Sequence, residues 1–458
     1  MGAIDKSTTI DVSSNFYNVI NGRLMATDQT IYGINPATGE PNPEVPLSTE
    51  KDVDSAVNSA HNAFKTWSKT SWHLRQNAVI AFADALDKHK EDFAKMLTQE
   101  QGKPYPFALS EIQLGVHFLK SLAKIELKPE VLEEDEEKKT IIRYTPLGPA
   151  VCIIPWNFPV HLACGKIAPA LLTGNPVIMK PSPFTPYCNL KLGELGLQYF
   201  PPGVFQVLSG DNNLGPWLTA HPDIMKISFT GSTFIGKKVM ESASKTLKRV
   251  TLELLSFLNS GQICVAIKRI YVHESIYQQF RKALITHTKT LKVGLGTEEG
   301  VFIGPVQNAT QYKHVKSFFS DIEKENWSVA VGGRIEEKSP GYFIPPTIID
   351  KPADDSRIVV EEPFGPIVPL LTWSDEAEVI ARANDTMMGL GASVWSNDPD
   401  EATRIALQLE AGSVWVNSHA KLNPNAPFGG HKESGIGSEW GVGGLRSFCN
   451  VQTLYLRK

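Results

Sequence analysis

The sequence predicts an α/β fold with two domains, and three observations lead to this prediction. From residue 160 to residue 255, short apolar segments alternate with helical ones, which is typical of a parallel sheet covered by helices. A second alternation of the same kind follows Cys264. The chain of 458 residues is long enough for two or three domains, each with a buried core.

The N-terminal part begins with short strands and turns over residues 1–45, since turn-forming residues cluster at 35–40. A helix is expected from near Thr49. Asp52 follows it at the spacing of a capping box, and apolar side chains then recur with helical spacing as far as Trp67.

A second helix is predicted from Trp72 to Gln101, because Gly102 and Pro104 are helix-ending residues. Residues 140–154 alternate or run apolar, with Pro146 and Gly148 between the two apolar groups. This pattern predicts a hairpin-like excursion that leads into a buried strand.

The two alternating blocks supply the remaining elements. Strands are predicted at 177–179, 204–207 and 224–230 in the first block, and at 270–272, 328–331, 367–371, 392–395 and 413–416 in the second, with helices at 277–291 and 398–410. The border between the two domains is expected near residues 254–264.

The composition excludes several classes of function. A net charge of −4 and the lack of a long basic run argue against nucleic-acid binding. No apolar run is long enough to span a membrane, and no signal peptide is visible. The five cysteines are scattered without metal-like spacing, so we expect no bound metal and a reduced, cytoplasmic location.

The segment from Gly231 to Lys237 follows a predicted strand and opens a predicted helix, where backbone N–H groups can hold a pyrophosphate. The segment is also close to the P-loop of nucleoside-triphosphate hydrolases, but Lys238 stands where that motif needs Ser or Thr for magnesium. A glycine turn without a ligand is the third interpretation.

Cys264 follows a glycine turn, and Glu253 lies eleven residues before it. A thiol can attack a carbonyl carbon and form a thioester, and a carboxylate can activate the water that hydrolyses the thioester. Taken alone, Cys264 would more often be a small buried apolar residue, and Glu253 a solvated acid.

Seven motifs in a fixed order resemble the aldehyde dehydrogenase superfamily over residues 18 to 450. The motifs are the segments 35–40 (NPATGE), 101–104 (QGKP), 155–159 (PWNFP), 180–182 (KPS), 229–232 (FTGS), 361–366 (EEPFGP) and 427–430 (PFGG). The resemblance implies NAD(P)-dependent oxidation of an aldehyde to a carboxylic acid.

The resemblance implies a role for each residue that matches a motif. Cys264 would be the nucleophile, the side-chain amide of Asn157 and the backbone N–H of Cys264 would hold the oxyanion, and Glu253 would activate water. The cofactor-binding residues would be Trp156, Lys180, Gly231, Ser232, Gly236, Glu362 and Phe364. Pro183 stands where many NAD-preferring members carry an acid, so the cofactor would be NAD, with NADP as an alternative.

The resemblance also implies the domains. A Rossmann-like cofactor domain would comprise residues 1–130 and 151–254, and an α/β catalytic domain residues 255–425. A small β element from residues 131–150 and 440–458 would form a homo-oligomer, either a dimer or a tetramer.

The chain departs from the family between the carboxylate and the thiol. Leu254 and Leu255 stand where the family has a glycine pair, and about two dozen residues are missing between them. In the family these residues form a turn, a core strand of the catalytic domain and most of the helix that carries the cysteine. We therefore expect impaired activity, and a catalytically inactive subunit is the alternative function.

Overall fold

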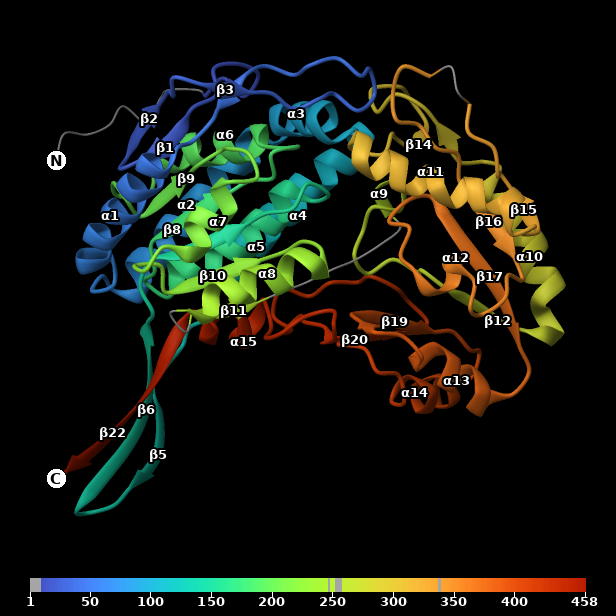
Figure 1. The fold of residues 1–458 in the computed structure, drawn as a ribbon. Coiled ribbons are helices and arrows are strands. Elements are labelled where there is room, and N and C mark those ends of the chain that lie inside the picture. The colour runs from blue at the N-terminus through green and yellow to red at the C-terminus, as the bar shows by residue number, and fades with distance from the viewer. Residues whose placement is uncertain (1–9, 246–247, 252–257, 337–338) are drawn as a thin grey trace.

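The computed structural model describes residues 10–245, 248–251, 258–336 and 339–458. Figure 1 shows two lobes side by side and a narrow arm that projects from the first lobe. The structure thus has the mixed α/β architecture that the sequence predicts. The domain boundaries given above stay a prediction.

The first lobe is built on a seven-stranded sheet. Its strands, in spatial order, are β11 (Arg249–Thr251), β10 (Lys226–Phe229), β7 (Ala150–Ile153), β8 (Val177–Lys180), β9 (Phe205–Val207), β1 (Asn18–Ile20) and β2 (Arg23–Met25). The first five strands are parallel, and β1 and β2 add an antiparallel edge. The parallel strands β7, β8 and β10 are buried along their whole length, as is usual for a sheet covered on both faces.

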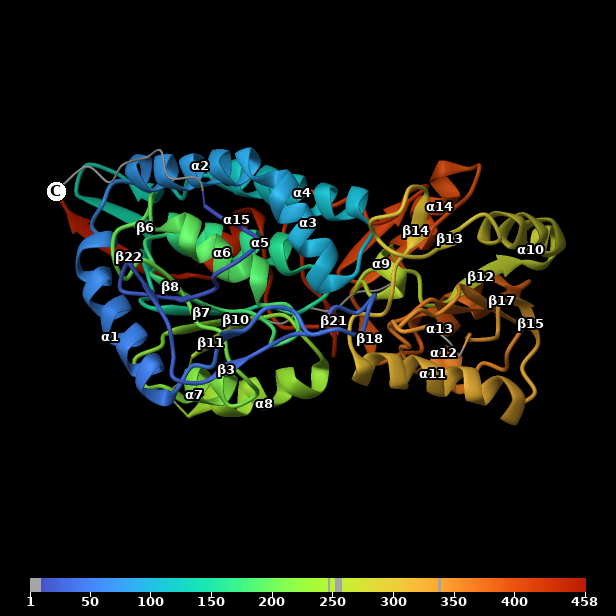
Figure 2. The ribbon, with the colours of Figure 1, turned by 90° about the horizontal axis from the view of Figure 1, so that it is seen from above.

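Helices cover both faces of this sheet, as Figure 2 shows. One face carries α1 (Glu50–Trp67), α7 (Leu214–Ala220) and α8 (Thr233–Ser244). The other carries α2 (Trp72–Lys88), α3 (Lys90–Gln101), α4 (Tyr105–Leu122), α5 (Pro159–Leu172), α6 (Tyr187–Gly196) and α15 (Gly441–Arg446). The expected capping box is present at α1, where the Thr49 backbone N–H donates to Asp52 over 2.8 Å.

Two details of the helices differ from the sequence-based prediction. The single helix expected from Trp72 to Gln101 is wrong, because the chain breaks at His89 into α2 and α3. Gly102 ends α3 in the left-handed conformation as expected, but α4 was not predicted and begins directly after Pro104. Pro104 comes after the end of α3 and is the N-cap residue of α4, so a residue that cannot continue one helix directly precedes the next.

The second lobe contains a four-stranded sheet with the order β12 (Ile270–His273), β17 (Ile367–Trp373), β16 (Thr347–Asp350) and β15 (Val329–Val331). Side chains of α10 (Glu274–Thr288) pack on one face. Those of α11 (Ala309–Lys324) and α12 (Arg357–Val360) pack on the other. The remaining elements of this lobe are β13 (Lys292–Val293), β14 (Val301–Ile303), α13 (Glu376–Asn384), α14 (Pro399–Ala406), β18 (Met388–Gly389) and β21 (His431–Lys432).

A separate two-stranded parallel sheet joins β19 (Gly391–Val394) to β20 (Ser413–Val416). Within the described residues, β12 pairs with β17 alone and β19 pairs with β20 alone. The second lobe therefore has two parallel sheets, each with a strand edge that no described strand continues.

The arm is a three-stranded antiparallel sheet of β22 (Cys449–Arg457), β6 (Lys138–Pro146) and β5 (Glu130–Glu134). Nine residue pairs join β22 to β6. A short hairpin-like pair, β3 (Thr30–Ile31) with β4 (Val45–Pro46), completes the first lobe. Searching the part of the chain that the structure describes finds no helix that is both long and apolar enough to cross a bilayer.

Candidate active site

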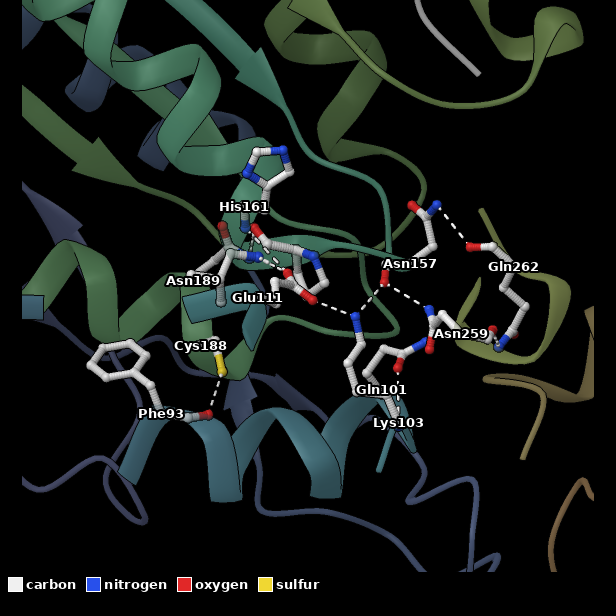
Figure 3. A network of polar contacts seen from close by, with 12 residues as sticks. Phe93, Gln101, Lys103, Glu111, Asn157, His161, Cys188, Asn189, Asn259 and Gln262 are labelled. Carbon is white, nitrogen blue, oxygen red and sulfur yellow. Dashed lines mark hydrogen bonds and ion pairs between the residues drawn. The ribbon is translucent and has the colours of Figure 1, made fainter. Parts of the chain in front are cut away.

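Asn157 lies between strand β7 and helix α5, on the side of the first lobe that faces the second. Its side chain is 4% exposed, and the amide nitrogen donates a hydrogen bond of 3.0 Å to the backbone oxygen of Gln262. The backbone oxygen of Asn157 accepts two further bonds, from Lys103 over 3.1 Å and from Asn259 over 3.0 Å (Figure 3). Asn157 thus links the two lobes through both its side chain and its backbone.

A buried ion pair holds the segment that carries Asn157. Lys103 pairs with Glu111, and both side chains are almost fully enclosed. The other carboxylate oxygen of Glu111 accepts the backbone N–H groups of Val160 over 2.9 Å and His161 over 3.1 Å. These are free N–H groups of the first turn of α5, so the carboxylate caps the helix and fixes its start. Burial lowers the pKa of Lys103, and the charge of Glu111 opposes this shift.

The segment before Cys264 has an unusual backbone. In the short turn α9 (Leu258–Gly261), Asn259 and Ser260 both have φ of 60°, and Gly261 has φ of 78°. Consecutive non-glycine residues in the left-handed region cost about 1–2 kcal/mol each, although Asn tolerates it better than most residues. Side-chain bonds hold the turn: Ser260 donates to the Gly304 oxygen over 2.9 Å, and Gln262 donates to the Asn259 oxygen over 2.9 Å.

Cys264 is the half-buried cysteine of the chain, whereas the other four are buried, and none of the five forms a disulfide. It lines a cavity of about 670 Å³ together with Asn157. Cys264 and Asn157, predicted from separate segments of the sequence, are therefore brought to one cavity.

The cavity wall is mainly apolar and aromatic. Part of it is supplied by Phe158, Leu162, Ile263, Phe428 and Trp440. In the second lobe, β12, α10, β16 and β17 supply Ile270, Leu284, Ile348 and Val368. The thiol of Cys264 therefore lies in the wall of a large apolar volume to which the second-lobe sheet contributes.

A smaller hollow lies on the other side of the α9 turn and is lined by Gly261, Lys268, Glu362 and Phe364. Burial raises the pKa of Glu362, and the nearby Lys268 opposes this rise. Burial also lowers the pKa of Lys268 to about 8. The rings of Phe364 and Trp156 meet edge to face, with their centroids 5.5 Å apart, so three of the predicted cofactor-binding residues lie around this hollow or against it.

The other predicted cofactor-binding residues lie where parallel strands end. Lys180 is the last residue of β8, is 7% exposed, and donates to the Pro181 oxygen over 3.1 Å. Burial lowers the pKa of Lys180 to about 8. Gly231 and Ser232 join β10 to α8, and the Ser232 hydroxyl accepts from the Ile235 N–H over 3.4 Å at the start of the helix.

These positions fit a dinucleotide. Ligands of open α/β sheets bind at the carboxyl ends of the parallel strands, and a helix N-terminus there favours a pyrophosphate. The Thr230 hydroxyl oxygen, at the end of β10, is buried without a hydrogen-bond partner within the described residues. Such a group marks a place where a ligand can supply the missing partner.

Glu253, Leu254 and Leu255 lie outside the described residues, so the structure gives no position for the predicted base. The described strand before them, β11, ends at Thr251. Gly236 is the fourth residue of α8, and its N–H bonds to the Ser232 oxygen over 2.8 Å. No group of three or more His, Cys, Asp or Glu side chains that could hold a metal ion is found in the ranges that the structure describes.

Sequence reasoning missed several residues of this region. Lys103 was noted as part of a motif, but its bond to Asn157 was not, and Glu111 and His161 were not noted at all. A lysine followed eight residues later by a glutamate gives no sign of burial, because both residue types are usually exposed. Only the folded chain shows that both side chains meet in the core.

Comparison with known proteins gives consistent results over the whole chain. The family model described as "Aldehyde dehydrogenase family" matches residues 24–256 and 255–454. The aldehyde dehydrogenase LUC3 of a Fusarium species is 39% identical over 97% of this chain and 99% of its own length. An aldehyde dehydrogenase of Agaricus bisporus is 37% identical over 95% of this chain and 94% of its own.

Solved structures are similar as well. The NAD+ complex of an aldehyde dehydrogenase from Bacillus cereus superposes with a TM-score of 0.93 at 32% identity, covering 97% of both chains. The alignment with the Fusarium protein runs over 469 positions, whereas 97% of 458 residues is about 444, so about 25 positions have no residue from this chain. The two matched stretches of the family model meet at residues 255 and 256. This is the place where the sequence predicts missing residues.

Proposed function

Because this chain belongs to the aldehyde dehydrogenase family, with NAD as its cofactor, we propose that the Cys264 site performs the oxidation of an aldehyde to a carboxylic acid. The observation that carries this proposal is the meeting of Cys264 and Asn157 in the wall of one large apolar cavity. The two residues are about a hundred positions apart in the sequence, and both have the chemical groups that the reaction needs.

The proposed chemistry starts with attack by the Cys264 sulfur on the aldehyde carbon, which gives a tetrahedral thiohemiacetal. One N–H of the Asn157 amide is used in the bond to Gln262, and its second N–H is the donor for the developing oxyanion. A preorganised donor of this kind is worth about 3 kcal/mol. The bonds from Lys103 and Asn259 to the Asn157 backbone keep this donor in place.

Bound NAD supplies the hydride acceptor. For its binding we propose Lys180 and the turn Gly231–Gly236 with Ser232 on the adenosine and pyrophosphate side, and Glu362, Phe364 and Trp156 on the nicotinamide side. The buried Thr230 hydroxyl and the Trp156–Phe364 contact support this assignment. NADP remains an alternative because Pro183 supplies no acid against a ribose phosphate.

The thioester left on Cys264 must be hydrolysed, and we assign the activation of water to Glu253. We further propose that this step and the first one are impaired in the chain as it stands. Three features support impairment: the break between the two matched stretches of the family model at residues 255–256, the edges of β12 and β19 that no described strand continues, and the left-handed turn before Cys264. A nucleophile displaced by 1 Å loses on the order of a hundredfold in rate.

The test inserts, between Leu254 and Leu255, the residues that the Fusarium relative carries at the unmatched positions. The control insert has the same length, with its apolar residues replaced by Ser. NADH formation is followed for a panel of short aliphatic and aromatic aldehydes. We expect the first insert to raise the rate at least about a hundredfold, the Ser-substituted insert to leave it unchanged, and Cys264→Ser to abolish it.

Two outcomes contradict different parts of the proposal. If the chain without an insert already oxidises an aldehyde as fast as the chain with the insert, the proposal that the chain is impaired is wrong. If the chain with the insert folds, yet no aldehyde of the panel is oxidised, then aldehyde oxidation at this site is wrong. Sequencing the native transcript across Leu254 and Leu255 shows separately whether the shorter chain is the natural product.

We propose that the projecting arm of β5, β6 and β22 assembles the chain into a dimer or tetramer, since β5 is exposed along its length and lies at a sheet edge. Light scattering on the full chain and on a chain ending at Phe448 tests this. A chain that assembles without turnover would support the alternative of an inactive subunit.

Two further predictions concern the class of enzyme and its location. No observation favours nucleotide hydrolysis. We propose a cytoplasmic location, and its support is that none of the five cysteines forms a disulfide.

A further inference from the structure

His161 presents a polar ring in an otherwise aromatic and apolar part of the Cys264 cavity. It is the third residue of α5, is 3% exposed, and lines the cavity beside Phe158 and Leu162. Neither ring nitrogen has a hydrogen-bond partner within the described residues. Figure 3 shows the ring pointing away from Glu111, which binds the backbone N–H of the same residue.

The surroundings of the ring are aromatic. The ring of Phe118 meets it edge to face at 4.5 Å, and the ring of Trp440 lies at 5.7 Å. Phe428 stacks on Trp440 with ring centroids 4.6 Å apart. These contacts and the bond of its backbone to Glu111 fix the place of His161, so the imidazole cannot leave this wall to find water.

The ring is uncharged under ordinary conditions. Burial lowers the pKa of His161 to about 3, and the nearby Lys103 adds to this effect. A neutral imidazole carries one N–H donor and one acceptor nitrogen. Both are unused in this structure, and a buried polar group without a partner raises the free energy of the site until a ligand or water satisfies it.

A second histidine in the cavity wall serves as a comparison. The His419 ring nitrogen Nε2 lies 2.5 Å from the backbone oxygen of Val265, so one of its two nitrogens is already used. His419 therefore has less to gain from a ligand than His161. His161 lines the same cavity as Asn157 and Cys264, so a substrate held in this cavity can contact its ring.

Building on the proposed aldehyde oxidation, we propose that His161 determines specificity by binding an uncharged hydroxyl or carbonyl group of the substrate, a few bonds from its aldehyde carbon. The substrate class is then a hydroxy- or oxo-aldehyde with a flat, apolar skeleton that packs on the Phe428–Trp440 wall. A charged group is excluded, because its desolvation in this apolar wall has no compensating charge: Lys103 is already paired with Glu111.

The test measures binding rather than turnover, so that it does not depend on the activity of the chain. Its probes are 3-phenylpropanamide and its three ring-hydroxylated isomers, whose amide carbonyl resists attack by a thiol. Titration calorimetry on the full chain gives the ratio of affinities between each isomer and the parent amide. We expect at least one isomer to bind about tenfold more tightly than the parent, as one regained hydrogen bond allows.

Two variants assign this ratio to the ring nitrogens. His161→Phe keeps the aromatic packing and removes both nitrogens, so it should bring the ratio to about one while leaving the parent amide's affinity nearly unchanged. His161→Gln keeps a donor and an acceptor, so it should retain part of the preference for the hydroxylated isomer. His419→Phe should retain this preference fully. Unfolding temperatures confirm that each variant is folded.

The outcomes separate the two proposals. If every isomer binds like the parent amide, or if the preference survives in His161→Phe, the role of His161 is overturned and the proposed function is not affected. If none of the four amides binds at all, the assignment of this cavity as the aldehyde site is overturned together with it.

Discussion

The ammonium nitrogen of Lys103 lies 3.1 Å from the backbone oxygen of Asn157, inside the protein core. The same ammonium pairs with Glu111, whose carboxylate holds the first turn of α5. One buried charge pair thus fixes both the residue that we assign to the oxyanion and the helix that follows it. The position of Asn157 therefore depends on residues with no chemical role of their own.

Replacing Lys103 alone should be strongly destabilising. Lys103→Met leaves Glu111 as an uncompensated buried charge, and we expect a loss of about 3–5 kcal/mol in the free energy of unfolding. The double variant with Glu111→Gln should recover much of this loss, since the Gln oxygen can still accept the two N–H groups of α5. Urea unfolding measures both. A loss below about 1 kcal/mol in Lys103→Met would show that the pair is not the support described above.

Cys264 should react with thiol reagents faster than the other four cysteines. It is half-buried, while Cys152, Cys164, Cys188 and Cys449 are buried. Iodoacetamide labelling of the native chain, read by peptide mass spectrometry, should therefore modify Cys264 first. Cys264→Ser should remove the rapid label, and Cys152→Ser should not. Labelling of a buried cysteine as fast as Cys264 would contradict this prediction.

Gly261 should not tolerate a side chain. A Cβ atom there would lie 2.1 Å from the Gly365 oxygen, and the residue has φ of +78°. Gly300 is the matched control, because its φ is +75° but no atom lies within 4 Å of the position of a Cβ. We expect Gly300→Ala to cost about 1 kcal/mol from backbone strain alone. Gly261→Ala should cost about 2–3 kcal/mol more, because the backbone of residue 365 must move. Equal losses in the two variants would contradict the close approach.

Acid should destabilise the protein through His161. Its pKa is lowered from 6.5 to about 3 in the folded chain, so as pH falls the unfolded chain takes up the proton first. The contribution of His161 to the free energy of unfolding is complete above pH 6.5 and is lost as the pH falls from 6.5 toward 3. This single group should lower the free energy of unfolding by about 1.4 kcal/mol per pH unit in that range.

The matching experiment compares urea unfolding of the natural chain and His161→Phe at pH 7 and pH 5. Between pH 7 and pH 5, the free energy of unfolding of the natural chain should fall by about 2 kcal/mol more than that of His161→Phe. Burial of Glu100 raises its pKa to about 7, which acts in the opposite direction, but it does so in both proteins and cancels in the comparison. Parallel pH profiles for the two proteins would rule out the buried neutral imidazole.

The parts of the fold that depend on local sequence were predictable. The alternation of strands and helices gave the parallel sheet, and the Gly231 turn lies at a strand end before a helix as expected. The break at His89 was not predictable, because the residues on both sides favour helix and no glycine or proline marks it. Helix boundaries of this kind are decided by packing against α4 and α6, which the sequence does not express.

At the site, the residues with chemical groups were identified from motifs, and those that hold them were not. Cys264 and Asn157 meet at one cavity, and Trp156 contacts Phe364. The role of Glu253 stays a prediction, since it lies outside the described residues. His161 could not be identified from sequence, because its importance rests on the lack of partners for its ring, which only the three-dimensional surroundings reveal.

The pairing of β6 with β22 has a consequence for how the protein is made. Arg143 lies opposite Gln452, and the side chains of these two residues, 309 positions apart, are hydrogen-bonded. At a synthesis rate of about 5–20 residues per second, β6 leaves the ribosome roughly 15–60 s before its partner strand exists. During that time β6 has only β5 beside it, and a two-stranded hairpin is marginally stable in water. Any assembly through the complete three-stranded arm must therefore wait until residues 449–457 have been synthesised.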